Sequence, residues 1–181
     1  MPIEALNNIL NKEIIQDFDT LKGEAILKEY DCRSKTKPIC IQGVPTDTIV
    51  FKLDRKISGA VKKSYYISTY KGIQQSCDYV IITRIEGQGH IILCELKSDS
   101  GGGWNQLIHT KPFIDYLKSL VNVHENIKME NFKKHFILFS TSKRLNKGYV
   151  YPSNITKKEY RGEIIKLLGN PTHVNLLKIL K

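Results

Sequence analysis

The chain of 181 residues is 41% hydrophobic and 25% charged, which is typical of one globular domain, over residues 1–181, with a sizeable core. Lysine and arginine number 28 against 18 aspartate and glutamate, so the formal net charge is +10. This surplus favours a polyanionic partner, nucleic acid or an acidic membrane surface, and the simpler alternative is that it only maintains solubility. No apolar run approaches the roughly 20 residues of a membrane span, so we expect no membrane-spanning segment.

The N-terminal part of the chain begins with a helical pattern. Apolar residues recur at steps of three and four over residues 3–21, which predicts an amphipathic helix. Gly23 interrupts the pattern, and residues 24–30 are a candidate for a further short helix. Strand patterns follow, because β-branched or aromatic runs separated by glycine-containing turns occupy residues 38–41, 48–53 and 64–68.

A β-hairpin is predicted in the middle of the chain. Its strands are residues 77–84 and 90–97, and its turn is residues 86–89, where two glycines occur. A glycine-rich loop at residues 98–103 follows the hairpin and leads into the next helix.

The C-terminal half alternates between helical and strand patterns. An apolar stripe predicts a helix over residues 104–121, with a kink or a break near Pro112. Residues 132–140 predict another buried strand. A capping-box pattern opens a predicted helix at residues 156–168, and residues 174–180 fit either a strand or a helix.

Three charged residues lie in the otherwise apolar hairpin. Side chains alternate along a strand, so Glu95 and Lys97 share one face and stand about 7 Å apart. Counting back across the turn puts Asp78 opposite a residue in the mid-nineties, so the three side chains are expected to converge at one end of a sheet. The alternative is that Glu95 and Lys97 are a solvated pair on an edge strand and that Asp78 is a turn residue.

Buried charges of this kind need partners. Two converging carboxylates, Asp78 and Glu95, can hold Mg²⁺ or Mn²⁺, hard ions that prefer oxygen ligands, and the carbonyl of Leu96 could add another. Such an ion polarises a phosphate oxygen and lowers the pKa of a bound water. Lys97 would position that water or neutralise charge on the phosphorus, so the three residues predict phosphodiester hydrolysis.

These residues resemble a known motif. Asp78, sixteen intervening residues and then Glu95-Leu96-Lys97, on adjacent strands before a helix, resemble the PD-(D/E)xK nuclease superfamily, which includes restriction endonucleases, junction resolvases and phage-defence nucleases. The resemblance covers residues 1–140. It implies an α/β fold with a restriction-endonuclease-like mixed β-sheet core, flanked by helices in the order helix, three-strand meander, helix, strand, with extra strands in the N-terminal half. It also implies that Asp78 and Glu95 bind the metal and that Lys97 assists the nucleophile.

Other positions carry less of the family pattern. Cys77 stands where the namesake proline of the motif would be. Gln106 sits where some branches of the family carry a glutamine directed at the metal centre. Many members also contribute a glutamate from the first helix, and here Glu24 is favoured among the candidates, which also include Glu4, Glu13 and Glu29.

A basic loop and the cysteines complete the candidate features. Lys143, Arg144 and Lys147 follow the strand at 132–140, where they could contact a nucleic-acid backbone or form a solvated turn. The cysteines have no CxxC spacing and the N-terminus has no signal-peptide pattern, so we expect reduced thiols in a cytoplasmic protein; the cysteines are Cys32, Cys40, Cys77 and Cys94.

The sequence therefore predicts an endonuclease that depends on Mg²⁺ or Mn²⁺, acts on DNA and serves restriction or phage defence. A homodimer or a partner in a defence complex is plausible, because cutting a duplex usually needs two sites. Two alternatives stay open. One is a catalytically silent nucleic-acid-binding or scaffold protein of the same fold, and the other is a nuclease subunit that is active only within a complex.

Overall fold

The computed structural model describes residues 2–29, 36–53, 75–98, 103–141, 155–169 and 171–181. These residues form a large mixed sheet, a smaller sheet and helices on both sides of the large sheet. The chain is thus an α/β protein, as predicted. Among the described helices none is long and apolar enough to cross a membrane.

The large sheet has seven strands and combines antiparallel and parallel pairing. In spatial order, the first four strands pair antiparallel with one another. The fifth and sixth strands then pair parallel to the strand before them, and the seventh, at the edge, pairs antiparallel with the sixth. In spatial order they are β1 (Ile15–Gln16), β4 (Thr48–Lys52), β5 (Tyr79–Ile85), β6 (Gln88–Lys97), β7 (Lys133–Ser140), β9 (Glu163–Gly169) and β8 (Thr156–Tyr160).

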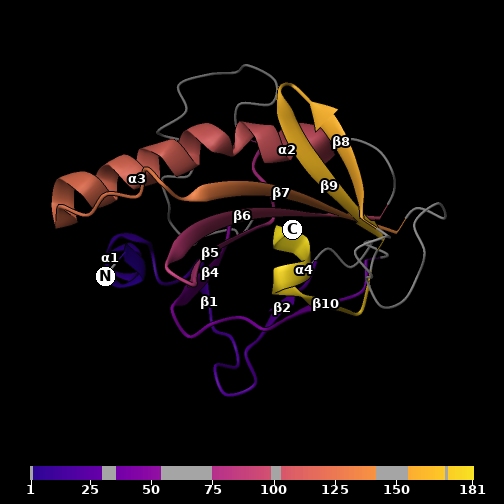
Figure 1. Cartoon of the computed structure of the whole chain (residues 1–181), viewed down its shortest axis with the longest axis horizontal. Coiled ribbons are helices and arrows are strands. Elements are labelled where there is room, and N and C mark those ends of the chain that lie inside the picture. Colours follow the sequence, from indigo (N-terminus) through magenta and orange to yellow (C-terminus); the bar gives the residue numbers. More distant parts are fainter. Residues whose placement is uncertain (1, 30–35, 54–74, 99–102, 142–154, 170) are drawn as a thin grey trace.

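The smaller sheet joins segments that are far apart in the sequence. Its central strand β3 pairs antiparallel with β2 and parallel with β10. Figure 1 shows α2 and α3 on one side of β6 and β7, with α4 and the smaller sheet on the other. The bounds are β2 (Glu24–Leu27), β3 (Ile39–Gln42), β10 (His173–Asn175), α1 (Pro2–Ile9), α2 (Gly103–His109), α3 (Lys111–Glu125) and α4 (Leu176–Leu180).

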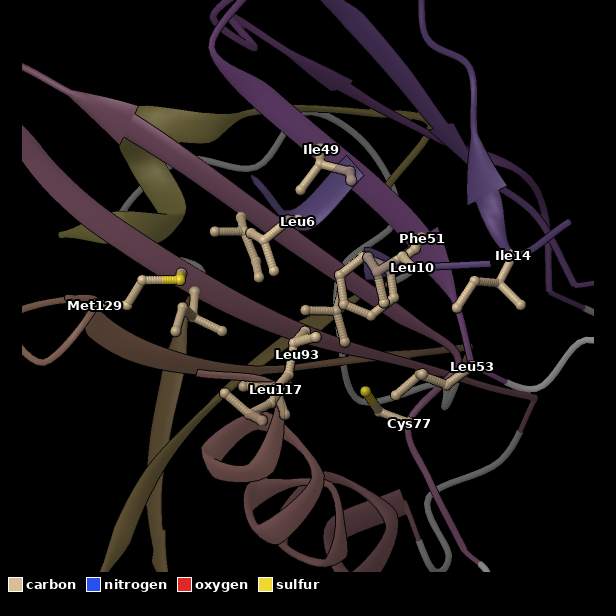
Figure 2. Packing of buried hydrophobic residues seen from close by; sticks show 14 of the residues in the cluster. Leu6, Leu10, Ile14, Ile49, Phe51, Leu53, Cys77, Leu93, Leu117 and Met129 are labelled. Carbon is tan, nitrogen blue, oxygen red and sulfur yellow. The ribbon is translucent and has the colours of Figure 1, made fainter. Parts of the chain in front are cut away.

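Alternation along the central strands divides the core into two layers. On β6, Ile91 and Leu93 belong to one buried cluster, and Ile92 and Cys94 belong to the other. The first layer packs beneath α1, α2 and α3, and Figure 2 shows side chains of α1, β4 and α3 gathered near Leu93. The second layer lies between the large sheet, the smaller sheet and α4. Because both faces are covered, β6 is a buried central strand and not an edge strand.

Several predicted elements are confirmed. The hairpin at 77–84 and 90–97 corresponds to β5 and β6, joined by the two-residue turn Glu86-Gly87. The strand at 132–140 is β7, and the helix after the glycine loop breaks at Thr110, next to Pro112, into α2 and α3.

The predicted N-terminal helix over 3–21 is wrong beyond Ile9. The side chain of Asn11 accepts a hydrogen bond from the N–H of Glu13 (2.9 Å), which favours a turn over a further helical turn. Leu10 and Ile14 still reach the core, whereas Leu21 is 99% exposed. The spacing of three and four between apolar residues therefore marks the buried side chains of a short helix and of the turn that follows it.

Two further predicted helices are strands in the structure. Residues 24–30 contain β2, because pairing with β3 overrides a local helical preference. Residues 156–168 form the β8–β9 hairpin, whose turn residues Arg161 and Gly162 both have positive φ, 51° and 78°. This is the dihedral pattern of a type I′ turn. The segment 174–180 combines both alternatives, since it spans the end of β10 and all of α4. The strand predicted at 64–68 lies outside the described residues.

Candidate active site

Asp78 and Glu95 lie side by side at the end of the β5–β6 hairpin. The register pairs Tyr79 with Cys94, so Asp78 falls opposite Glu95 one position further on. Each carboxylate accepts a backbone hydrogen bond from the other's strand: Glu95 Oε2 from the N–H of Asp78 (3.2 Å), and Asp78 Oδ2 from the N–H of Leu96 (2.7 Å). The backbone thereby fixes both carboxylates on one face of the sheet.

Both acids are buried, and a lysine stands beside them. Asp78 is 4% exposed and Glu95 is 0% exposed. The Nζ of Lys97 lies 2.9 Å from Glu95 Oε1, with 28% of the lysine side chain exposed. Among the described residues Lys97 is the one partner recorded at Oε1, and a carboxylate oxygen has lone pairs for more than one. A buried carboxylate oxygen left in this state is suited to a further cation.

The electrostatics of the pair follow from burial and like charge. Burial, followed by the charge of Asp78, raises the pKa of Glu95 to about 8, although Lys97 opposes the shift. Burial alone would lower the pKa of Lys97, but the charges of Glu95, Asp78 and Glu29 raise it. Near neutral pH the lysine is therefore charged and Glu95 is largely protonated, because ionising it beside Asp78 in a buried position is unfavourable.

The N-terminus of α2 closes one side of the pair. A Cβ on Gly103 would stand 3.0 Å from the Cγ of Glu95 and 3.2 Å from the Cγ of Lys97. Further along the helix, the hydroxyl of Thr110 accepts a hydrogen bond from the N–H of Cys77 (2.8 Å), which holds the start of β5 against the end of α2. Glycine is needed at 103 because these side chains and the helix meet so closely.

Gln106 and Cys77 also lie near the carboxylates. The side-chain amide of Gln106 points to the carbonyl of Ser76 (3.5 Å), two residues before Asp78. Cys77, at the position of the motif's proline, is fully buried, and its thiol donates to the carbonyl of Tyr79 (3.3 Å). Burial raises the pKa of Cys77 well above its ordinary value, so this thiol is unreactive.

Among the glutamate candidates the structure favours Glu29 over Glu24. Glu24 lies in β2 of the smaller sheet, not in a helix, and its carboxylate accepts a hydrogen bond from Gln42 (3.0 Å). Glu29 follows β2, and its charge contributes to the raised pKa of Lys97.

A second titratable pair lies toward the other end of β6. The Nδ1 of His90 and the Nε2 of His135 are 3.0 Å apart on the adjacent strands β6 and β7. Burial, with Lys166, His90 and Lys133, lowers the pKa of His135 to about 4. The histidines looked scattered in the sequence, because the β6–β7 pairing that joins these two spans more than forty residues.

Some site predictions lie outside what the structure describes. Lys143, Arg144 and Lys147 are in residues 142–154, which are not described. Within the described residues no group of three or more histidine, cysteine, aspartate or glutamate side chains is arranged to hold a metal ion. The site is therefore a pair of carboxylates with a lysine.

The fold and the site together define an α/β protein with a buried carboxylate pair and a lysine at one end of a central antiparallel hairpin. Comparisons of the chain with protein-family models, with curated proteins and with solved structures gave no match.

Proposed function

We propose that this protein is a metal-dependent nuclease that hydrolyses phosphodiester bonds of DNA at Asp78, Glu95 and Lys97. The observation that carries the proposal is the buried pair of carboxylates, Asp78 and Glu95, with the ammonium of Lys97 2.9 Å from Glu95 Oε1. Ionising Glu95 beside Asp78 is unfavourable in the metal-free site, and a bound divalent cation would offset that cost.

The order of the elements supports a restriction-endonuclease-like fold. Helix α1 precedes the antiparallel meander β4–β5–β6, the helices α2 and α3 follow, and β7 then joins parallel to β6. Apart from β1, β2 and β3, which come between α1 and β4, this order is similar to the succession helix, three-strand meander, helix, strand that the resemblance to the PD-(D/E)xK nucleases implies. Asp78 immediately precedes the second strand of that meander, and Glu95 and Lys97 lie on the third, an arrangement that resembles the motif.

The residues present fit a divalent ion of the Mg²⁺ type. Magnesium keeps several waters and is commonly held by one or two carboxylates, so a two-carboxylate site is sufficient. Asp78 and Glu95 supply oxygen ligands only, which suits Mg²⁺ or Mn²⁺ better than softer metals. Such an ion lowers the pKa of a bound water and polarises the phosphate.

The protein's own residues have distinct roles in this proposal. Asp78 and Glu95 hold the ion because the backbone N–H groups of Asp78 and Leu96 fix their orientation. Lys97, kept protonated by its acidic neighbours, orients the attacking water or neutralises charge that develops on the phosphate. Gln106 and Glu29 are candidates for positioning residues at the rim.

The wider biological assignment belongs to the same proposal. The net charge of +10 suits a DNA substrate, and the free, buried thiols of Cys77 and Cys94 suit the reducing cytoplasm. Restriction or phage defence, with a homodimer or a defence-complex partner, is the setting that we propose by analogy of fold and motif alone.

The test is DNA cleavage by matched variants. Wild-type protein, Lys97→Ala and Lys134→Ala are incubated with supercoiled plasmid and with single-stranded DNA in Mg²⁺, Mn²⁺ or EDTA. Lys134 is the control because it also pairs with a carboxylate, that of Asp115 (2.6 Å), on the surface between α3 and β7. We expect metal-dependent cutting by wild type and Lys134→Ala, and a loss of about 100-fold or more in Lys97→Ala.

Two outcomes count against the nuclease. Equal cutting by Lys97→Ala and wild type would place the activity elsewhere or in a contaminant. DNA binding without cutting in any metal would favour a silent binding protein or a subunit that requires a partner.

A further inference from the structure

A cluster of aromatic and basic side chains adjoins the proposed active site. Trp104 and Tyr160 have ring centroids 6.0 Å apart, Lys158 Nζ lies 5.1 Å from the Trp104 centroid, and Arg161 Cζ lies 5.4 Å from the Tyr160 centroid. We call these four residues the aromatic–basic surface. Lys158 and Arg161 are exposed, and the two rings are half-buried.

The β8–β9 hairpin brings this surface together. Lys158 and Tyr160 share the face of edge strand β8 that contacts α2, because they are two residues apart. The hydroxyl of Tyr160 donates a hydrogen bond to Asn105 Oδ1 (2.7 Å). Arg161 follows in the type I′ turn. The hairpin thus holds Lys158 and Tyr160 against the N-terminal turn of α2, with Arg161 over the ring of Tyr160.

The two cations lie over rings and not beside carboxylates. Glu163, on β9, pairs with Lys111, and Glu159 lies on the opposite face of β8 from Lys158. In the part of the chain that the structure describes, Lys158 and Arg161 therefore keep their positive charge available to an anionic ligand. Cation–π contacts hold such side chains in place without neutralising them.

The aromatic–basic surface and the carboxylate pair contact neighbouring residues of α2. Gly103 packs against the side chains of Glu95 and Lys97, and Trp104 is the next residue. A DNA strand with one phosphate at the carboxylates and its next nucleotides over α2 would pass Trp104 and reach Lys158. The rings offer stacking and the cations offer phosphate contacts, the two components of single-strand recognition.

We propose that the aromatic–basic surface binds an unpaired DNA strand beside the scissile phosphate, so that the preferred substrate is single-stranded DNA or a single-stranded segment. The inference rests on the proposed function for the place of the scissile phosphate. A duplex hides the faces of its bases, so only an unpaired strand gains the stacking contribution.

The experiment measures binding without metal, so that it does not depend on cleavage. Trp104 is the only tryptophan of the chain, and its fluorescence therefore reports directly on this surface. The protein in EDTA is titrated with a short oligothymidylate and with a short duplex of mixed sequence. We expect quenching by the single strand and an affinity roughly tenfold higher than for the duplex at the same salt concentration.

Two neighbouring lysines provide the matched control. Lys158→Ala removes a cation from the surface, whereas Lys157→Ala removes one from the opposite face of the same strand. We expect Lys158→Ala to weaken single-strand binding and to reduce its salt dependence by about 0.7 in the log–log slope. Lys157→Ala should change the single-strand affinity and its salt dependence much less.

Failure of this inference is distinct from failure of the proposed function. Absence of Trp104 quenching, equal affinity for duplex and single strand, or equal weakening by the two lysine variants would overturn the surface, even if the protein cuts DNA. Quenching with single-strand preference would support it, even in a protein that cuts nothing.

Discussion

Glu95 is the residue on which the account depends most. Its pKa is raised to about 8 because it is buried next to Asp78. A group whose pKa is raised in the folded state stabilises the fold fully at pH values below its ordinary pKa, here 4.5. This contribution decreases as the pH rises and is lost once the pH passes about 8. The metal-free protein should therefore become less stable in mildly alkaline solution.

The variant Glu95→Gln tests this residue. In EDTA, we expect the thermal midpoint of wild type to fall between about pH 6 and about pH 9, and that of Glu95→Gln to fall less. At the upper pH the variant should be the more stable by at least about 2–4 °C, the shift that corresponds to about 1 kcal/mol in a chain of this size. If the thermal midpoints of the two proteins changed with pH in parallel, Glu95 would not titrate in this pH range.

At the residue scale, the sequence was sufficient to predict that the three charged side chains of the hairpin converge, but not which side chains from other segments lie close together. Alternation and turn counting are local properties, so they were sufficient to predict that Asp78, Glu95 and Lys97 meet. The contact between His90 and His135 depends on β6 and β7, which are distant in sequence. No spacing rule within one segment predicts such contacts.

Among the elements, α2 matters most to the site. Its first residue, Gly103, lies so close to β6 and β7 that a methyl group would stand 2.6 Å from Leu138 Cδ1 and 3.0 Å from Glu95 Cγ. The end of the leucine side chain can move, but Glu95 is held by its hydrogen bond from Asp78.

We therefore expect Gly103→Ala to affect function more than stability. Alanine favours a helix over glycine by roughly 0.5–1 kcal/mol, which partly offsets the clash. The displaced Glu95 should nevertheless reduce cleavage and metal affinity by about tenfold, since small misplacements of catalytic groups have large effects. Thermal melting and single-turnover cleavage measure the two effects separately. A variant with unchanged cleavage and metal affinity would show that α2 does not position the carboxylates.

The β8–β9 hairpin illustrates the limit of prediction for elements. Thr156 and Glu159 match a capping box, and lysine and glutamate are good helix formers, so local propensity favoured a helix. The structure instead uses Arg161-Gly162 as a turn of the kind that Glu86-Gly87 forms between β5 and β6. Pairing of β9 with β7 then outweighs propensity, because Ile165 and Leu168 become buried.

For the whole molecule, the mixed sheet with helices on both sides was predictable and the second sheet was not. The central strands are long apolar runs, which indicate burial on both faces. The β3–β10 pair instead joins Cys40 to His173, and such long-range pairing leaves no periodic signal in either segment. The smaller sheet and α4 cover one face, which leaves α2 and the carboxylate pair on the other.

Binding of Mn²⁺ is the most direct test of the central claim that Asp78 and Glu95 form a divalent-cation site. Calorimetric titration of wild type, Asp78→Asn, Glu95→Gln and the control Asp115→Asn compares the buried acids with a half-exposed one. We predict one ion per chain for wild type and Asp115→Asn, proton release near neutral pH as Glu95 ionises, and affinity at least about tenfold lower in the other two. Equal affinity in all four proteins, or no binding to any of them, would contradict the account.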